Sequence, residues 1–291
     1  MLNDTHMAVE TCGVSFGYPD GFVALDDVNF RVRRGEFVAM LASNGSGKTT
    51  LIKVLAGLLK PQRGETFING MPIQSYAPAS LYQHVGLVFQ NPNDQLFCAT
   101  VNEDVAFGPR NLNLAETDVQ MRVTEALQAV GAADLGERAI HHLSYGQQKR
   151  VAIAGVLAMK PPILILDEPT AGLDPLGEHQ MLVLLGKLNR EQGITVVLAT
   201  HSVDTLPLFA DRIYLLNRGR VLKDGAPDEV FRDHGMIERA SLRLPYVTRL
   251  LHELKRYDGV PIQGLPLTVR EAREQLLSLI PDSMIEEVQT P

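Results

Sequence analysis

Short apolar runs alternate with helical patterns between residues 35 and 201, and this alternation limits the fold more than any other feature of the sequence. The apolar runs lie at 35–42, 85–90, 161–169 and 194–201. The helical patterns lie at 48–60, 144–159 and 175–190. Strands that are apolar almost throughout are typical of parallel sheets covered on both faces. We therefore expect an α/β fold with a mostly parallel central sheet.

Further strands and one more helix are predicted outside this set. Residues 23–32 mix apolar and polar side chains, as a strand of an outer sheet does. Asn-Gly at 69–70 predicts a hairpin between two short strands, and residues 211–225 predict a second hairpin. Thr117 and Gln120 have the spacing of a capping box, so we expect a helix to begin there.

The sequence changes character near residue 235. Two helical patterns follow, at 241–259 and 268–280, around a loop rich in proline and glycine. We expect one large domain over residues 1–235, with a helical subdomain at about 91–160. The remaining residues, 236–291, form a small α-helical extension, which we interpret as a dimerisation element. The alternative is that both of its helices pack only on the domain of the same chain.

Charge and composition exclude several classes of function. The formal net charge is −7, which weighs against non-specific nucleic-acid binding because such binding needs a basic surface. Cys12 and Cys98 form no CxxC motif, so a reducing compartment is expected. No apolar run reaches the roughly 18–20 residues of a membrane span, and the first residues do not resemble a signal peptide. We expect a soluble cytoplasmic chain that is able to dock on a membrane protein.

The stretch LASNGSGKTT (41–50) predicts a phosphate-binding loop between a strand and a helix. Gly45 and Gly47 let the backbone curl so that its N–H groups point inward at an anion. The positive N-terminus of the following helix points at the same anion. Lys48 is placed to contact the β- and γ-phosphates, and Thr49 to ligate Mg²⁺.

One position departs from this motif. The usual pattern has a glycine six residues before the lysine, where this chain has Ala42. The alternative is therefore an ordinary Gly/Ser turn before a helix. A methyl group at Ala42 is tolerated if φ is negative and costly if φ is positive. Because the phosphate-facing donors come from later residues, we expect a functional loop.

Two acidic residues end the apolar run ILILDEP. Asp167 at the end of a buried strand can hold Mg²⁺ beside the phosphate loop, usually through water. Glu168 can orient or deprotonate an attacking water. The alternative is a pair of ordinary surface acids at a strand end, which is weakened by the phosphate-loop motif that precedes them.

The segment LSYGQ (143–147) predicts a second ligand-binding helix N-terminus. Ser144 and Gln147 have the spacing of a capping box. The backbone donors of such a helix start point outward at an anion, and Gly146 lets a ligand approach closely.

These segments together resemble the ATPases of ABC transporters. LSYGQ resembles their LSGGQ motif, with Tyr145 where a glycine is usual. The phosphate loop, ILILDEP, AGLDP (171–175) and ATHS (199–202) complete the set in the family's order over roughly 190 residues. The resemblance implies a RecA-like parallel core, an antiparallel β subdomain and a helical subdomain. Ser43, where many relatives have proline, is a second mild departure after Ala42.

The resemblance also implies roles for single residues. Tyr18 resembles the aromatic residue that stacks on adenine, with Phe16 as the alternative. Gln90 resembles the glutamine that contacts Mg²⁺ or water and senses the membrane partner, and His201 the histidine at the γ-phosphate. Asp174 resembles the aspartate that crosses the dimer interface. The implied catalytic residues are Glu168, His201 and Gln90, and the implied Mg²⁺ ligands are Thr49, Gln90 and Asp167. The implied ATP-binding residues are Tyr18, Ala42, Ser43, Asn44, Gly45, Ser46, Gly47, Lys48, Thr49, Thr50, Ser144, Gly146, Gln147 and Asp174.

In this family two ATPase protomers bind head to tail, with each ATP between the phosphate loop of one and the LSGGQ helix of the other. A dimer, expected to be a homodimer, is therefore implied. Residues 85–112 and 147–161 resemble the ATPases of energy-coupling factor importers. Their resemblance implies an integral membrane coupling subunit, a substrate-binding membrane subunit and a place on the cytoplasmic face of the membrane, with no nucleic-acid partner.

Residues 202–220 and the last helical patterns resemble cobalt and nickel importers most. A vitamin importer of the same class is the alternative, followed by a soluble ABC ATPase without a transport role and by a regulatory module without turnover. His141 and His142 are adjacent, but side chains of neighbouring helical residues diverge and no metal-ligand cluster surrounds them. We expect them to have structural or surface roles, with the transported metal bound by the membrane subunit.

Overall fold

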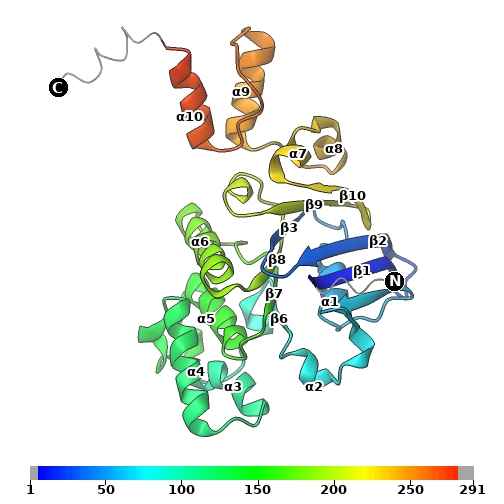
Figure 1. Cartoon of the computed structure of the whole chain (residues 1–291). Coiled ribbons are helices and arrows are strands. Elements are labelled where there is room, and N and C mark those ends of the chain that lie inside the picture. Colours follow the sequence, from blue (N-terminus) through cyan, green and yellow to red (C-terminus); the bar gives the residue numbers. More distant parts are fainter. Residues whose placement is uncertain (1–5, 281–291) are drawn as a thin grey trace, which may run out of the picture.

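The computed structural model describes residues 6–280, apart from the side chains of residues 78 and 79. Within these residues the strands form two sheets (Figure 1). The four-stranded sheet has the order β2 (Val23–Arg33), β1 (Met7–Gly17), β4 (Arg63–Ile68) and β5 (Met71–Pro72). The six-stranded sheet has the order β10 (Arg220–Gly225), β9 (Arg212–Asn217), β3 (Phe37–Ala42), β8 (Thr195–Thr200), β7 (Ile163–Asp167) and β6 (Val85–Val88).

The strand directions agree with the sequence prediction. All neighbours in the six-stranded sheet are parallel except β9 and β10, which form the hairpin expected at 211–225. The four-stranded sheet is antiparallel, and β4 pairs with β5 across the turn at Asn69 and Gly70. The chain therefore combines a mostly parallel core with an antiparallel outer sheet.

Helices cover both faces of the six-stranded sheet (Figure 1). Alternate residues of β3 separate two cores: Phe37, Ala39 and Leu41 face the larger helical layer, whereas Val38, Met40 and Ala42 face α1 and the outer sheet. This is the two-residue period of a strand buried on both sides. The helices of the main body are α1 (Lys48–Leu55), α2 (Pro78–Leu81), α3 (Val101–Asn111), α4 (Glu116–Ala129), α5 (Tyr145–Leu157), α6 (Pro175–Gln192), α7 (Pro227–Phe231) and α8 (His234–Arg239).

Several local expectations need correction. The helix predicted at 48–60 ends at Leu55, because Gly57 has a φ of 74° and turns the chain. The capping box predicted at Thr117 is wrong: α4 has Ala115 as its N-cap, and no side chain caps it. Thr100 and Glu103 form a capping box instead, at the start of α3. The short helices α7 and α8 were not predicted.

The C-terminal residues form a helical pair, α9 (Tyr246–Tyr257) and α10 (Val269–Ser278). Leu251, Ile262 and Ala272 are buried in a small core of their own. Figure 1 places this pair at one end of the molecule, beyond α7 and α8. In the part of the chain that the structure describes, no helix has the length and apolar character needed to cross a membrane.

Candidate functional site

The phosphate loop lies between the end of β3 and the start of α1. Gly47 is the N-cap of α1 with a φ of 98°, and a Cβ there would lie 2.4 Å from the carbonyl oxygen of Ala24. Gly45 also has a positive φ, 76°, but a Cβ there would meet nothing within 4 Å. The loop therefore needs Gly47 for packing and backbone conformation, and Gly45 for conformation on its open side.

Ala42 is compatible with this loop. It is the last residue of β3, is fully buried and is not among the residues with positive φ. Its carbonyl oxygen accepts a hydrogen bond from Lys48 Nζ at 2.6 Å. The negative φ expected from the sequence is confirmed, and the methyl group packs in the core rather than against a phosphate.

Asp167 is the last residue of β7, which is separated from β3 by β8, and its side chain contacts the first turn of α1. Thr49 Oγ1 donates a hydrogen bond to Asp167 Oδ2 at 2.8 Å. Among the described residues, Asp167 Oδ1 is buried and has no hydrogen-bond partner. Burial raises the pKa of this carboxyl, and the hydrogen bond from Thr49 opposes that rise. A buried carboxylate oxygen without a partner beside a hydroxyl suits a hard cation such as Mg²⁺.

Glu168 lies between two basic side chains that come from distant parts of the chain. Its carboxylate is 3.2 Å from Lys48 Nζ and 2.9 Å from His201 Nδ1. Glu168 is only 4% exposed and has a φ of 46°, which is unusual for a residue with a side chain. The fold thus brings together Lys48, Glu168 and His201, which the sequence assigns to one nucleotide site.

A cavity of about 240 Å³ opens over the phosphate loop. This volume is below the roughly 300–1,000 Å³ of pockets that enclose whole ligands, so it suits the phosphate part of a nucleotide. Of the residues predicted from the sequence, those that line it are Ser43, Asn44, Gly45, Gly47, Lys48, Thr49, Thr50, Gln90, Glu168 and His201. Ala42, Ser46 and Asp167 lie behind this surface, where Ser46 Oγ hydrogen-bonds Ser43 Oγ at 2.9 Å.

The aromatic residue on the cavity wall is Phe22, which sequence analysis missed. Its side chain is 53% exposed, in the turn between β1 and β2. Tyr18 is half-buried nearby: its hydroxyl is 3.1 Å from Thr50 Oγ1, and its ring makes an edge contact with Phe16. The available signal was the place of Phe22 in the sequence, directly after the turn-forming residues Pro19, Asp20 and Gly21. Adenine stacking on Tyr18 stays a prediction.

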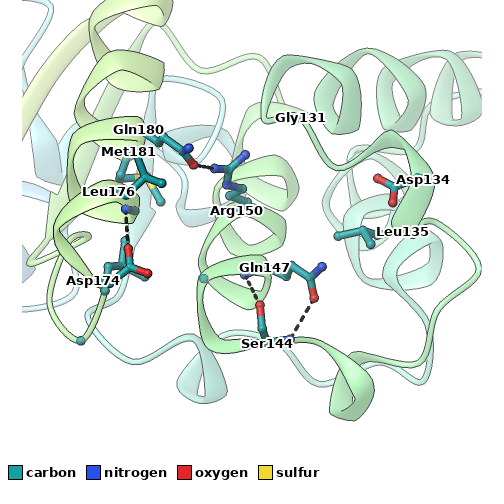
Figure 2. A pocket seen from close by; sticks show the side chains of 14 residues that line it. Gly131, Asp134, Leu135, Ser144, Gln147, Arg150, Asp174, Leu176, Gln180 and Met181 are labelled. Atoms are coloured by element: carbon teal, nitrogen blue, oxygen red, sulfur yellow. Dashed lines mark hydrogen bonds between the residues drawn. The ribbon is translucent and has the colours of Figure 1, made fainter.

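A second cavity, of about 510 Å³, lies at the start of α5 (Figure 2). Ser144 Oγ accepts a hydrogen bond from the Gln147 backbone, and Gln147 Oε1 accepts one from the Ser144 backbone, so the predicted capping box is confirmed. Gly146 also lines the cavity. On the opposite wall Asp174 caps α6 by accepting from the Gly177 N–H at 2.6 Å. The predicted residues of the signature segment (143–147) thus share one surface with Asp174.

The adjacent histidines differ from expectation in their geometry. His141 and His142 lie in a short 3₁₀ turn, and their rings meet edge to face with centroids 4.2 Å apart rather than diverging. Both are exposed. In the described part of the chain, no group of three or more His, Cys, Asp or Glu side chains is arranged to hold a metal ion.

Known proteins share both the sequence and the fold of this chain. Residues 25–171 match the family described as ABC transporter. The chain is 48% identical to the energy-coupling factor transporter ATP-binding protein EcfA of Methanocaldococcus jannaschii, over 94% of this chain and 98% of that protein.

Two solved structures are also similar. CbiO1 from Clostridium perfringens, described as part of the ABC transporter complex CbiONQ, has a TM-score of 0.74 and 42% identity, over 85% of this chain and 99% of that one. The cassette MJ0796, dimeric in a post-hydrolysis state with ADP and Pi, has a TM-score of 0.67 and 32% identity, over 75% and 98%. The chain therefore belongs to the ATP-hydrolysing subunits of ABC transporters, of the energy-coupling factor type, in which ATP hydrolysis is coupled to transport.

Proposed function

We propose that this chain powers the uptake of a transition-metal ion, cobalt or nickel, as the ATPase of an energy-coupling factor importer. The observation that carries the catalytic part is the Glu168 carboxylate, buried between Lys48 and His201 beside a phosphate loop. The metal rests on the sequence resemblance of residues 202–220 and of the last helical patterns. Similarity to CbiO1, part of the ABC transporter complex CbiONQ, supports the role in a transporter.

The residues of the phosphate cavity have complementary roles in this proposal. Backbone N–H groups of the loop and the start of α1 bind the phosphates. Lys48 neutralises their charge, for which it exchanges its contact with Glu168 for a phosphate oxygen. Glu168 then orients and deprotonates the attacking water, while His201 holds the Glu168 carboxylate and faces the terminal phosphate.

Mg²⁺ fits the residues at the edge of the cavity. Thr49 and Asp167 would supply oxygen ligands, and Asp167 Oδ1 has no hydrogen-bond partner among the described residues. Gln90 lines the same cavity and would complete the site. When bound, the ion neutralises charge on the phosphates and fixes their position.

A surface groove suits the membrane coupling subunit. It has a volume of about 480 Å³ and lies between the end of β6 and the helices α3 and α5. Phe97 and Phe107 stand exposed on its wall, with ring centroids 4.7 Å apart. Exposed aromatic pairs of this kind mark protein interaction sites. An amphipathic helix of the coupling subunit would bury both rings.

The groove also connects to the phosphate cavity. The Gln95 side chain accepts from the Phe89 N–H at 3.1 Å and donates to the Ala152 carbonyl at 2.8 Å, so it joins the end of β6 to α5. Phe89 directly precedes Gln90, which lines the phosphate cavity. A helix that pushes on this wall can therefore act on both Gln90 and α5.

Asp94 provides the test of docking. It is exposed in the turn that leads into the groove, so Asp94→Arg reverses a surface charge without disturbing the fold. We expect normal basal ATPase activity in the free protein and loss of transport in the assembled complex. Glu65→Arg, an exposed acid on the outer sheet, is the control and should transport normally. Unimpaired transport by the Asp94 variant would place the docking surface elsewhere.

The transported substrate is tested by co-purification. The chain is expressed with its membrane partners, and the captured complex is analysed for metals by mass spectrometry and for organic ligands after extraction. Cobalt or nickel in stoichiometric amount is the expected result. A bound vitamin would support the alternative importer, and a chain that hydrolyses ATP but captures no membrane protein would indicate a soluble ABC ATPase.

A further inference from the structure

Lys149 is a buried cation that takes no part in the proposed binding or hydrolysis of ATP. It lies on the second turn of α5 and is only 3% exposed. A buried charge is costly unless it is paired or hydrogen-bonded, and an apolar residue of similar size is often more stable. Burial lowers the pKa of Lys149 to about 8, although the Glu168 and Asp167 charges oppose that shift. Such a residue needs a specific partner.

That partner is the backbone of Glu168. Lys149 Nζ donates a hydrogen bond to the Glu168 carbonyl oxygen at 3.0 Å. The same oxygen accepts from the Ala171 N–H at 3.1 Å, and the Glu168 N–H donates to the Ala199 carbonyl at 2.9 Å. Both sides of the Glu168 residue are thus fixed by hydrogen bonds.

This fixation matters because the Glu168 backbone is in an unfavourable conformation. Its φ of 46° lies in the left-handed region, which a residue with a side chain adopts only when its surroundings impose it. The backbone conformation sets the direction of the side chain, which here ends between Lys48 and His201. A bond that holds the carbonyl therefore also holds the carboxylate.

Lys149 also belongs to the signature side of the molecule. Its Nζ lies 5.3 Å from the centroid of the Tyr145 ring, within the signature segment. The same ring covers Gly172, where a Cβ would lie 2.9 Å from a Tyr145 ring carbon. The first turns of α5 are thus packed against the turn that follows Glu168. Ser144, at the start of α5, lines the second cavity (Figure 2).

We propose that Lys149 is a positioning residue that holds the Glu168 carboxylate in place for hydrolysis and makes that placement depend on the signature segment. Glu168 faces the phosphate cavity, whereas Ser144 and Gly172 face the second cavity. A ligand that shifts the start of α5 must therefore act on Glu168 through Lys149. This inference rests on the proposed role of Glu168 in hydrolysis.

A series of substitutions tests the role. Lys149→Met keeps the apolar stem and removes the donor, Lys149→Gln keeps a neutral donor, and Lys149→Arg keeps the charge. We expect kcat to fall roughly tenfold to a hundredfold for Met, which is the size expected for one lost hydrogen bond to a charged group. The Arg variant should recover most of kcat. KM for ATP and binding of a fluorescent ATP analogue should change by less than about twofold, because no phosphate-binding group is altered. Lys187→Met, at an exposed lysine of α6, should behave as the parent protein.

A double-mutant cycle with Glu168→Gln distinguishes positioning from general damage. If Lys149 acts only through the Glu168 carboxylate, Lys149→Met should cause no further loss in the Glu168→Gln background, measured by single-turnover phosphate release. Full kcat in the Met variant, or an equal fold loss in both backgrounds, would overturn the inference. If thermal melting shows that the Met variant is unfolded, Lys149→Leu, which also removes the donor, replaces it in the same comparison. Near-normal turnover by Glu168→Gln alone would instead refute the proposed role of Glu168.

Discussion

Ala42→Gly restores the residue that the phosphate-loop motif usually has, and its outcome can be worked out from the structure. The Ala42 methyl is fully buried in the core beside α1. Losing one buried methyl costs about 0.8 kcal/mol. Glycine within a strand costs a further ~0.5–1 kcal/mol through the entropy of the unfolded chain. We therefore expect the free energy of unfolding to fall by about 1–2 kcal/mol, and Tm by roughly 2–3 °C.

ATP affinity should hardly change, since the group that meets Lys48 is the Ala42 carbonyl, which glycine retains. Titration with a fluorescent ATP analogue should give a Kd within about twofold of the parent value. A change of about 1.4 kcal/mol in the binding free energy would instead change Kd about tenfold. Ala39→Gly is the matched control, a fully buried alanine in the same strand that faces the other core. It should lose similar stability. A large gain in affinity, or an unchanged Tm, would refute the reasoning and show that alanine strains the loop.

Three further predictions concern turnover, pH and the C-terminal helices. Glu168→Gln should bind ATP normally, hydrolyse it about 10²–10⁴ times more slowly and accumulate as an ATP-bound dimer in size-exclusion chromatography; near-normal turnover would contradict this. Burial lowers the pKa of Lys149 from 10.5 to about 8, so between these pH values the unfolded chain binds more protons than the native one. The free energy of unfolding of the parent protein, from urea titrations, should therefore rise across this window relative to Lys149→Met, and a constant difference would be evidence against it. Because Tyr246, Leu250 and Tyr257 are exposed on α9, we expect a second protomer to cover them. Truncation after Leu244, which keeps α8 and the buried Ile237 and Ala240, should therefore leave a folded chain that binds ATP and sediments as a monomer without nucleotide. A dimeric truncated chain, or a monomeric intact one, would disprove this role.

The central sheet can be predicted from the sequence because each of its buried strands is a continuous apolar run. The six residues of β3 are all buried, and their apolar run is visible without knowledge of the partners. The capping box of Ser144 and Gln147 is equally local, since both members lie within one turn. The same spacing at Thr117 did not form a cap, whereas Thr100 and Glu103 formed one. Spacing alone therefore does not decide which turn starts a helix.

The conformation of the site depends on contacts that are distant in sequence, and these are not visible in any motif. Lys149 lies in the polar stretch GQQKR, which suggests a solvent-exposed residue, yet it reaches a carbonyl 19 positions away. The left-handed backbone of Glu168 likewise has hydrogen bonds to Lys149, Ala171 and Ala199, which lie in three segments. The motifs predict the groups that we propose to react, but not the residues that hydrogen-bond to them.

The balance of buried charges explains why ATP binding and hydrolysis should separate at Glu168. Lys48, Lys149, Asp167 and Glu168 are all buried, so two positive and two negative groups compensate one another in a region of low dielectric. In the proposed mechanism the phosphates replace Glu168 as the partner of Lys48, and the carboxylate then faces His201 and the attacking water. Glu168→Gln removes a negative charge that repels phosphate and leaves Lys48 available to it. Binding should therefore be kept or strengthened, while the group that accepts the proton is lost.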